Sequence, residues 1–261
     1  MKRLATTCPR PGLRAWVRGL LACGAILAHA ALAALATPAA HAAPAAARPT
    51  AAQGGLCSSG QRQSPIDIPA SRATPGPALR WDYRAAPLRV VNDGHTVRVR
   101  FAPGHKLWLG DQAHTLQQFH FHTPGGDRLQ GEDFPMGMHL LHKSAAGRLV
   151  SLVVLFRLGA EHPALAALLS HMPTRTPVQG QPEQTLAAVQ VNAAQWLPAS
   201  HAYYRYEGSV TDTPCTEGVL WLVMQQPLEL SAAQLARLGQ LFGPNARPVQ
   251  PLHGRVVTLT P

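Results

Sequence analysis

Acidic side chains are scarce in this sequence: 13 Asp and Glu stand against 23 Lys and Arg, giving a formal net charge of +10 at pH 7. Charged residues make up only 14% of the 261 positions and aromatic residues only 6%. Much of the basicity lies in the first 18 residues, which contain no acid. The remaining arginines are scattered, without a basic block or interleaved aromatic residues, so we expect no nucleic acid partner.

The N-terminal segment has the order of a secretory signal. Basic residues come first, an apolar run extends from Gly19 to Ala36, and Ala40-His41-Ala42 follows as a small-x-small cleavage site. We therefore expect a signal peptide at 1–42, a flexible spacer at 43–55 and one domain at 56–261, in a periplasmic protein without stable membrane association. An uncleaved anchor is the alternative, because the apolar run approaches the roughly 20 residues that span a bilayer.

Cysteine is scarce as well, with four residues in the chain. Cys8 and Cys23 fall within the predicted signal peptide, so only Cys57 and Cys215 remain in the exported protein. Two cysteines far apart in the sequence, in an oxidising compartment, favour a single disulfide that closes a long loop. Two unpaired buried thiols are the alternative.

Helical patterns are few, whereas short apolar or alternating runs recur between turn residues. This spacing predicts an antiparallel sheet, with strands at 88–91, 96–101, 107–109, 115–122, 136–142 and 149–156. A short helix is predicted at 163–170. A second is predicted at 231–242, with Ser231 as its N-cap and Gly243 as its stop.

The histidines are the strongest indication of chemistry. In Gln118-Phe119-His120-Phe121-His122, side chains alternate faces on a strand, so His120 and His122 point one way and the phenylalanines the other. A neighbouring strand could bring His139 beside them. Three imidazoles leave the fourth tetrahedral position of a zinc ion open, as in catalytic zinc sites. By itself the His-x-His pair is equally compatible with two core histidines.

A metal site of the cupin type also uses His-x-His, but it needs a glutamate three or four residues later. The residues that follow here are Thr123, Pro124, Gly125 and Gly126. No carboxylate is available at those positions, so the sequence favours three histidines as ligands of Zn2+.

Several separated motifs, in order, resemble those of exported bacterial alpha-class carbonic anhydrases, from about Cys57 to Arg255. They are 63–68 (QSPIDI), 92–97 (NDGHTV), 118–124 (QFHFHTP), 138–142 (MHLLH), 206–211 (YEGSVT), 214–218 (PCTEG) with Trp221, and 245–250 (NARPVQ). The resemblance implies a β-dominated, mixed (α+β) single domain built on a large, mostly antiparallel twisted sheet with a few short helices. It also implies reversible hydration of CO2 to bicarbonate and a proton, by attack of zinc-bound hydroxide.

Site residues follow from the same resemblance, position by position. His120, His122 and His139 are implied as zinc ligands, Thr211 as the hydroxyl that orients the nucleophile, and His95 as the proton shuttle. Gln118 is implied to hold one ligand imidazole by a hydrogen bond.

Four apolar residues are implied to line the CO2 pocket, although core packing would explain them equally well: Leu141, Val210, Val219 and Trp221. Cys57 and Cys215 match the disulfide of exported family members. The sequence does not decide whether the protein forms a homodimer.

The sequence departs from the family close to the metal. Gly126 and Gly137 stand where the family has two glutamates, one that accepts the threonine's proton and one that binds the third histidine. Loss of such a partner typically costs 10- to 100-fold in metal affinity or activity. A zinc- or bicarbonate-binding protein with little catalytic activity is therefore the alternative function. The roles of Asp127 and Asp212 are not predicted.

Overall fold

The computed structural model describes residues 55–172 and 182–261. They lie in the second of two compact units, residues 49–261. The predicted signal peptide and nearly all of the predicted spacer lie outside the described residues. Within the described part there are three short α-helices, α1 (Leu56–Ser59), α2 (Pro163–Leu169) and α3 (Ala232–Leu241), and a 3-10 helix at Ala193–Trp196. None of these helices is long and apolar enough to cross a bilayer.

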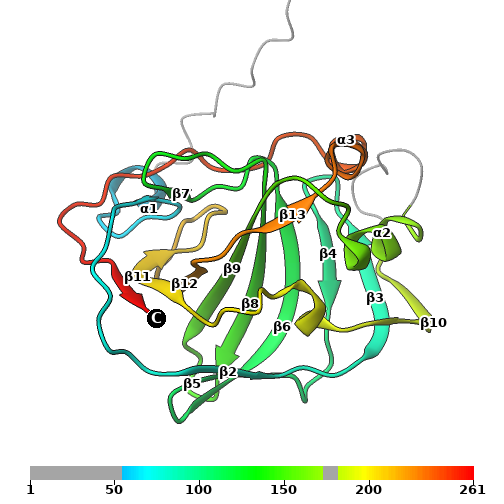
Figure 1. Cartoon of the computed structure of the whole chain (residues 1–261), viewed down its shortest axis with the longest axis horizontal. Coiled ribbons are helices and arrows are strands. Elements are labelled where there is room, and N and C mark those ends of the chain that lie inside the picture. Colours follow the sequence, from blue (N-terminus) through cyan, green and yellow to red (C-terminus); the bar gives the residue numbers. More distant parts are fainter. Residues whose placement is uncertain (1–54, 173–181) are drawn as a thin grey trace, which may run out of the picture. The chain divides into compact units, whose positions relative to one another are not determined.

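Strands are the commonest regular elements of the described chain (Figure 1). Their bounds are β1 Asp67–Ile68, β2 Leu79–Asp82, β3 Ala86–Asn92, β4 Val97–Arg100, β5 Lys106–Leu109, β6 Gln112–His122, β7 Arg128–Leu129, β8 Met136–Ser144, β9 Leu149–Leu158, β10 Gln184–Val191, β11 Tyr203–Ser209, β12 Glu217–Met224, β13 Leu228–Leu230 and β14 Thr258–Thr260.

Twelve strands form one sheet, in the order β10-β3-β4-β6-β8-β9-β12-β11-β14, with β13 beside β9 and β5 between β2 and β6. Strand β9 pairs with β12 and β13 in parallel, and the other pairs of this sheet are antiparallel. β1 and β7 form a separate parallel pair. The predicted β-dominated fold on a large, mostly antiparallel sheet is thus confirmed.

The centre of the sheet is buried on both faces. From Val150 to Phe156, β9 is buried at every position, so this strand shows no alternation. One face packs in a cluster that includes Phe119, Phe121 and Leu140, and the other in a cluster that includes Trp221. A strand covered on both sides reads as a continuous apolar run, which is the pattern of β9.

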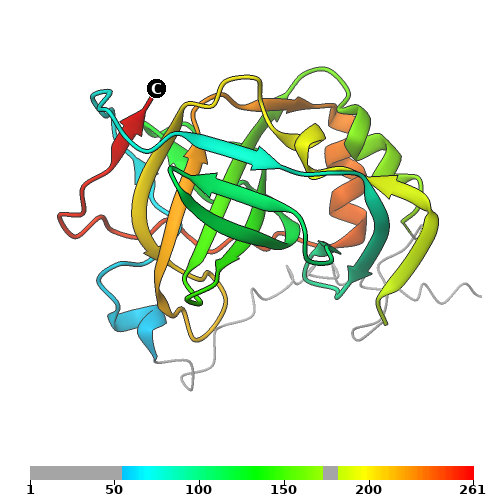
Figure 2. The ribbon, with the colours of Figure 1, turned by 90° about the horizontal axis from the view of Figure 1, so that it is seen from below.

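Helices α2 and α3 lie side by side at the end of the sheet that carries β3 and β10 (Figures 1 and 2). Ser231 caps α3 as predicted, and with Gln234 it forms a reciprocal capping box. The Gln234 side chain also bonds the backbone N–H and C=O of His162, just before α2, at 2.9 and 2.8 Å. One side chain therefore closes the first turn of α3 and links it to α2.

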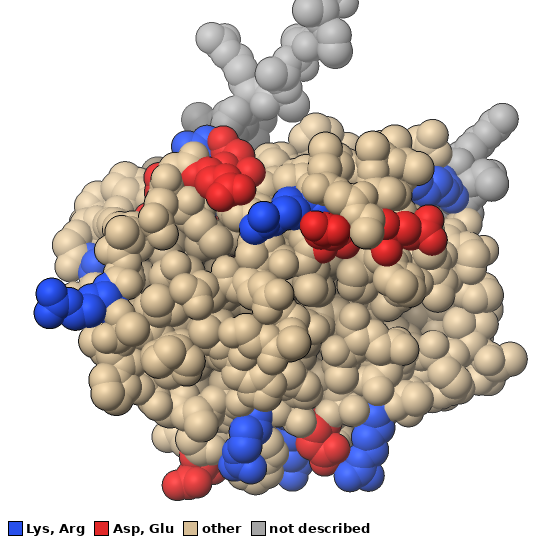
Figure 3. Space-filling model, in the orientation of Figure 1, with Lys and Arg blue, Asp and Glu red and all other residues tan. Residues whose placement is uncertain are grey.

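Charge is sparse on the face shown in Figure 3. Lys and Arg lie there in small groups, most of them near Asp and Glu, and most of the face is uncharged.

Candidate metal centre

Strand register brings the three predicted histidines together. β6 and β8 are antiparallel neighbours in which His120 lies opposite His139, His122 opposite Gly137, and Gln118 opposite Leu141. Directly opposite residues share a face of the sheet. The three imidazoles therefore project from one face, while Phe119 and Phe121, both 0% exposed, fill the core behind them.

The imidazole nitrogens have the spacing of a metal site. Each histidine offers a ring nitrogen, and the three nitrogens lie within 4.8 Å of one another. Nε2 of His120 is 3.1 Å from Nε2 of His122. Zn–N bonds of about 2.0–2.1 Å in a tetrahedron would separate two ligand nitrogens by about 3.3 Å, so the observed pair fits a shared zinc ion.

Gln118 has the predicted contact: its Oε1 lies 3.0 Å from Nδ1 of His120. Because an amide oxygen only accepts hydrogen bonds, it fixes the proton on Nδ1 and leaves the lone pair on Nε2. This tautomer is the one that a cation requires.

Burial keeps the imidazoles neutral. The pKa of His122 is lowered to about 4, mainly by burial and in part by the charges of His95 and Arg98, while Asp212 acts in the opposite direction. Burial also holds the pKa of His120 and of His139 well below the usual value. A neutral imidazole is the form that ligates a metal, so the triad is ready to bind a cation at neutral pH.

Gly126 lies in the loop after β6, and Gly137 on β8 packs against the same loop at Gly125. The carbonyl oxygen of Gly125 occupies the space that a Cβ on Gly137 would need, and Gly126 has a positive φ of 90°. Nε2 of His139 is buried and has no hydrogen-bond partner among the described residues. The backbone around 123–127 thus closes against β8 where a glutamate at 137 would stand.

Asp127 is buried beside this loop, with 1% of its surface exposed. Its Oδ1 accepts hydrogen bonds from the Ile66 N–H at 2.9 Å and from the Tyr206 hydroxyl at 2.8 Å. Burial raises its pKa to about 7, although these two bonds act in the other direction. Oδ2 has no partner in the described part of the chain. Burial of this carboxyl therefore favours its protonated form.

His95 and Asp212 lie near the triad, at its solvent side. His95 Nε2 is 3.8 Å from Asp212 Oδ1, and both side chains are about half exposed or more, at 52% and 68%. Both side chains influence the pKa of His122 electrostatically. The structure therefore brings the predicted shuttle residue close to the ligands, with Thr211 adjacent to Asp212 after β11.

Asn245 is a site residue that received no predicted role. Its Nδ2 donates to the carbonyls of His95 and Phe121 at 2.8 and 2.9 Å, and its Oδ1 accepts from the Thr123 N–H at 2.9 Å. One side chain thus joins the turn that carries His95 to the end of β6. Position 245 begins one of the motifs that carry the family resemblance, and this motif could have indicated that Asn245 belongs to the site.

The predicted pocket residues lie around the same face. Val219 and Trp221 are buried, while Leu141 and Val210 are partly exposed. The ring of Trp221 meets that of His139 edge-on, with centroids 5.0 Å apart, and its Nε1 donates to the Ser209 carbonyl at 3.0 Å. By contrast His142, whose place on β8 turns it away from His139, is buried on the opposite face, where Nε2 lies 2.6 Å from the Tyr83 hydroxyl.

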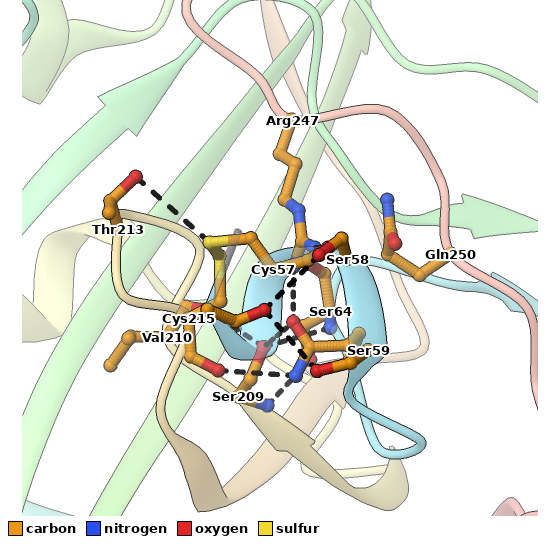
Figure 4. The surroundings of a disulfide bond; sticks show 12 residues. Cys57, Ser58, Ser59, Ser64, Ser209, Val210, Thr213, Cys215, Arg247 and Gln250 are labelled. Atoms are coloured by element: carbon orange, nitrogen blue, oxygen red, sulfur yellow. Dashed lines mark hydrogen bonds between the residues drawn. A yellow bond between two sulfur atoms is a disulfide. The ribbon is translucent and has the colours of Figure 1, made fainter. Parts of the chain in front are cut away.

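The Cys57–Cys215 disulfide is formed (Figure 4), across a sequence separation of 158. It joins α1 to the loop between β11 and β12, the loop that also contains Thr211. Arg247 supports the same junction, donating to the carbonyls of Cys57 and Ser64 at 2.6 and 3.0 Å. The start of the domain is therefore fastened to the loop that carries Thr211.

Comparison with known proteins agrees with this geometry. The family model described as eukaryotic-type carbonic anhydrase matches residues 50–261. A carbonic anhydrase of Pectobacterium carotovorum is 37% identical over 203 residues, covering 77% of this chain and 81% of that protein. The Photobacterium profundum alpha-carbonic anhydrase structure has a TM-score of 0.72 at 36% identity, covering 78% of this chain and 91% of the other.

A structure of dioscorin complexed with ascorbate also has a TM-score of 0.72, at 34% identity, covering 78% of this chain and 88% of the other. The sheet, the three facing histidines and these matches lead to one assignment: the chain belongs to the alpha-class carbonic anhydrase family.

Proposed function

We propose that this carbonic anhydrase hydrates CO2 reversibly with one Zn2+ held by His120, His122 and His139. The observation that carries the proposal is the facing triad, with its nitrogens within 4.8 Å and its pKa values lowered by burial. Zinc at three histidines supplies a hydroxide nucleophile near neutral pH by lowering the pKa of a water ligand.

The protein's own groups position the reactants and move the proton. Thr211 orients the nucleophile through its hydroxyl, and Leu141, Val210, Val219 and Trp221 give CO2 an apolar wall. His95 carries the released proton to solvent, since it is half exposed and imidazole exchanges protons near neutrality. Bicarbonate leaves as the product.

Zinc content and CO2 hydration, measured on one preparation, test the proposal. We expect about one zinc per chain and a hydration rate in a stopped-flow indicator assay, with both lost in His122→Ala. His171→Ala, at an exposed position outside the site, is the matched control and should retain both. Absence of hydration in protein that holds one zinc would overturn the proposal.

A zinc- or bicarbonate-binding protein with little catalysis is the second candidate. Gly126 and Gly137 favour it, because they remove the two carboxylates that the family places around the ligands. The related dioscorin complexed with ascorbate has the same fold. For this candidate, zinc-replete protein would bind bicarbonate yet hydrate CO2 no faster than His122→Ala does.

Export to the periplasm accords with the basic, then apolar, N-terminal segment and with the formed disulfide. N-terminal sequencing of protein recovered from the periplasm should locate a cleavage near Ala42.

A further inference from the structure

An arginine-lined groove lies beside the metal centre. Its volume is about 360 Å3, and its lining consists of Arg89, Arg98, Arg100, Phe101, Gln117 and Gln118. Three neighbouring strands, β3, β4 and β6, contribute most of these residues. Half of the lining is therefore arginine, in a chain where charged residues are few.

Register places the arginines on the face that carries the histidines. Arg98 lies opposite His120 and Arg100 opposite Gln118 across β4 and β6. Arg89 lies opposite Arg100 across β3 and β4. Since opposite residues share a face, the groove continues the metal-binding face of the sheet toward its β3 side.

Positive charge in the groove is only partly balanced. Glu183 pairs with two arginines at once, Arg89 at 2.7 Å and Arg100 at 3.2 Å. Asp93 pairs with Arg98 through Oδ2 at 3.4 Å, while its Oδ1 accepts from the backbone N–H groups of His95 and Thr96. Two negative carboxylates thus face three positive guanidinium groups, which leaves one positive charge unbalanced.

Two donors at the lining lack an acceptor within the described residues. Nε of Arg98 is buried and has no partner among the described residues, an arrangement that costs free energy unless an acceptor arrives. Gln118 uses its oxygen on His120, so its amide nitrogen is left as a donor. Guanidinium and amide donors without a matching acceptor form the kind of site that binds an oxyanion.

We propose that this groove binds a small oxyanion, held by Arg98, Arg100 and Gln118 beside the metal centre and not on it. Bicarbonate, the charged product, belongs to this chemical class, and so does inorganic phosphate. None of the three histidines takes part, so the proposal does not depend on zinc chemistry. The Gln118 side chain would lie between a bound anion and the ligand His120.

Calorimetric titration of metal-free protein at low ionic strength tests the proposal, because removal of the metal excludes anion binding to zinc. Inorganic phosphate is titrated in one arm and bicarbonate in the other, with chloride as the comparison. We expect saturable binding of at least one oxyanion, weakened about tenfold or more in Arg98→Gln/Arg100→Gln. Arg157→Gln, at an exposed arginine at the end of β9, removes one positive charge, as Arg100→Gln alone does, and should bind as the native chain does.

Circular dichroism and the thermal midpoint verify that each variant is folded. If the double variant is not folded, the single variant Arg100→Gln is used in its place, because the Arg100 side chain is 52% exposed. The proposal is overturned if neither oxyanion binds, if chloride binds equally well, or if Arg157→Gln loses as much affinity as the groove variants. A protein that binds phosphate in this way but fails to hydrate CO2 with zinc would overturn the proposed function and leave the groove proposal intact.

Discussion

Gly125 and Gly137 are in direct backbone contact: the carbonyl oxygen of Gly125 lies where any side chain on Gly137 would begin. The contact couples the loop after β6 to the strand that carries His139. A glutamate at 137 is therefore excluded by the path of the loop, and a glutamate at 126 would have to adopt a φ of 90°.

Gly137→Ala should destabilise the protein by about 1–3 kcal/mol, because its Cβ must displace backbone. Gly239→Ala is the matched control: Gly239 lies within α3, where an added Cβ meets nothing within 4 Å. That substitution should stabilise the helix by about 0.5–1 kcal/mol. Urea unfolding measures both, and equal behaviour of the two variants would contradict the contact described here.

Asp127→Asn should change how stability depends on pH. The folded carboxyl has a pKa raised to about 7, whereas in the unfolded chain it is near 3.9. Between these values the folded state keeps a proton that the unfolded chain releases, so a rise in pH favours unfolding of the native protein.

The amide that this substitution introduces cannot ionise, yet its oxygen can accept from Ile66 and Tyr206 as the carboxyl does. The free energy of unfolding of Asp127→Asn, relative to native, should therefore rise from pH 5 to pH 8 by about 2–3 kcal/mol. Urea unfolding at several pH values measures the difference. A difference that is flat with pH would mean that Asp127 is ionised throughout.

His95→Ala should lower kcat for CO2 hydration about tenfold in a weakly buffering solution, with kcat/KM little changed. The reason is that a proton carrier acts after CO2 has been converted. Added imidazole buffer should restore the rate, because it can take the proton directly. His171→Ala again serves as the control, and a fall in kcat/KM without rescue would show that His95 acts on the substrate step instead.

Removal of the disulfide should lower the free energy of unfolding by about 3–5 kcal/mol, since a loop of 158 residues is released in the unfolded state. The Cys57→Ser/Cys215→Ser variant measures this by urea unfolding. In that variant a reducing agent should have no further effect. Zinc content should persist, as the cysteines are not among the three candidate ligands.

Local patterns favoured the triad, and the family resemblance assigned the three histidines as ligands. Alternation on one strand places His120 and His122 on a common face, and a second apolar strand containing His139 was recognisable. Ser231 likewise marked the start of α3 through short-range capping chemistry, whereas the helix ends at Leu241, one residue before the predicted end. In each case the deciding interaction lies within a few residues or between adjacent strands.

Other features depend on distant parts of the chain and were not predicted. The contact between Gly125 and Gly137 depends on the path of a loop, and the burial of Asp127 depends on Ile66 and Tyr206, which are far from it in sequence. Strand β10 was missed because most of its side chains are exposed or partly exposed, without strict alternation. Its place at the end of the sheet comes from pairing with β3.

The pairing of β6 with β8 also gives the histidines a role in folding. A slip of one residue between these strands would turn His139 to the opposite face, away from His120. A cation that requires three imidazoles binds only the correct alignment, and so stabilises it against its competitors by mass action. Metal binding would thereby favour the correct strand register over slipped registers, in addition to any part the metal has in catalysis.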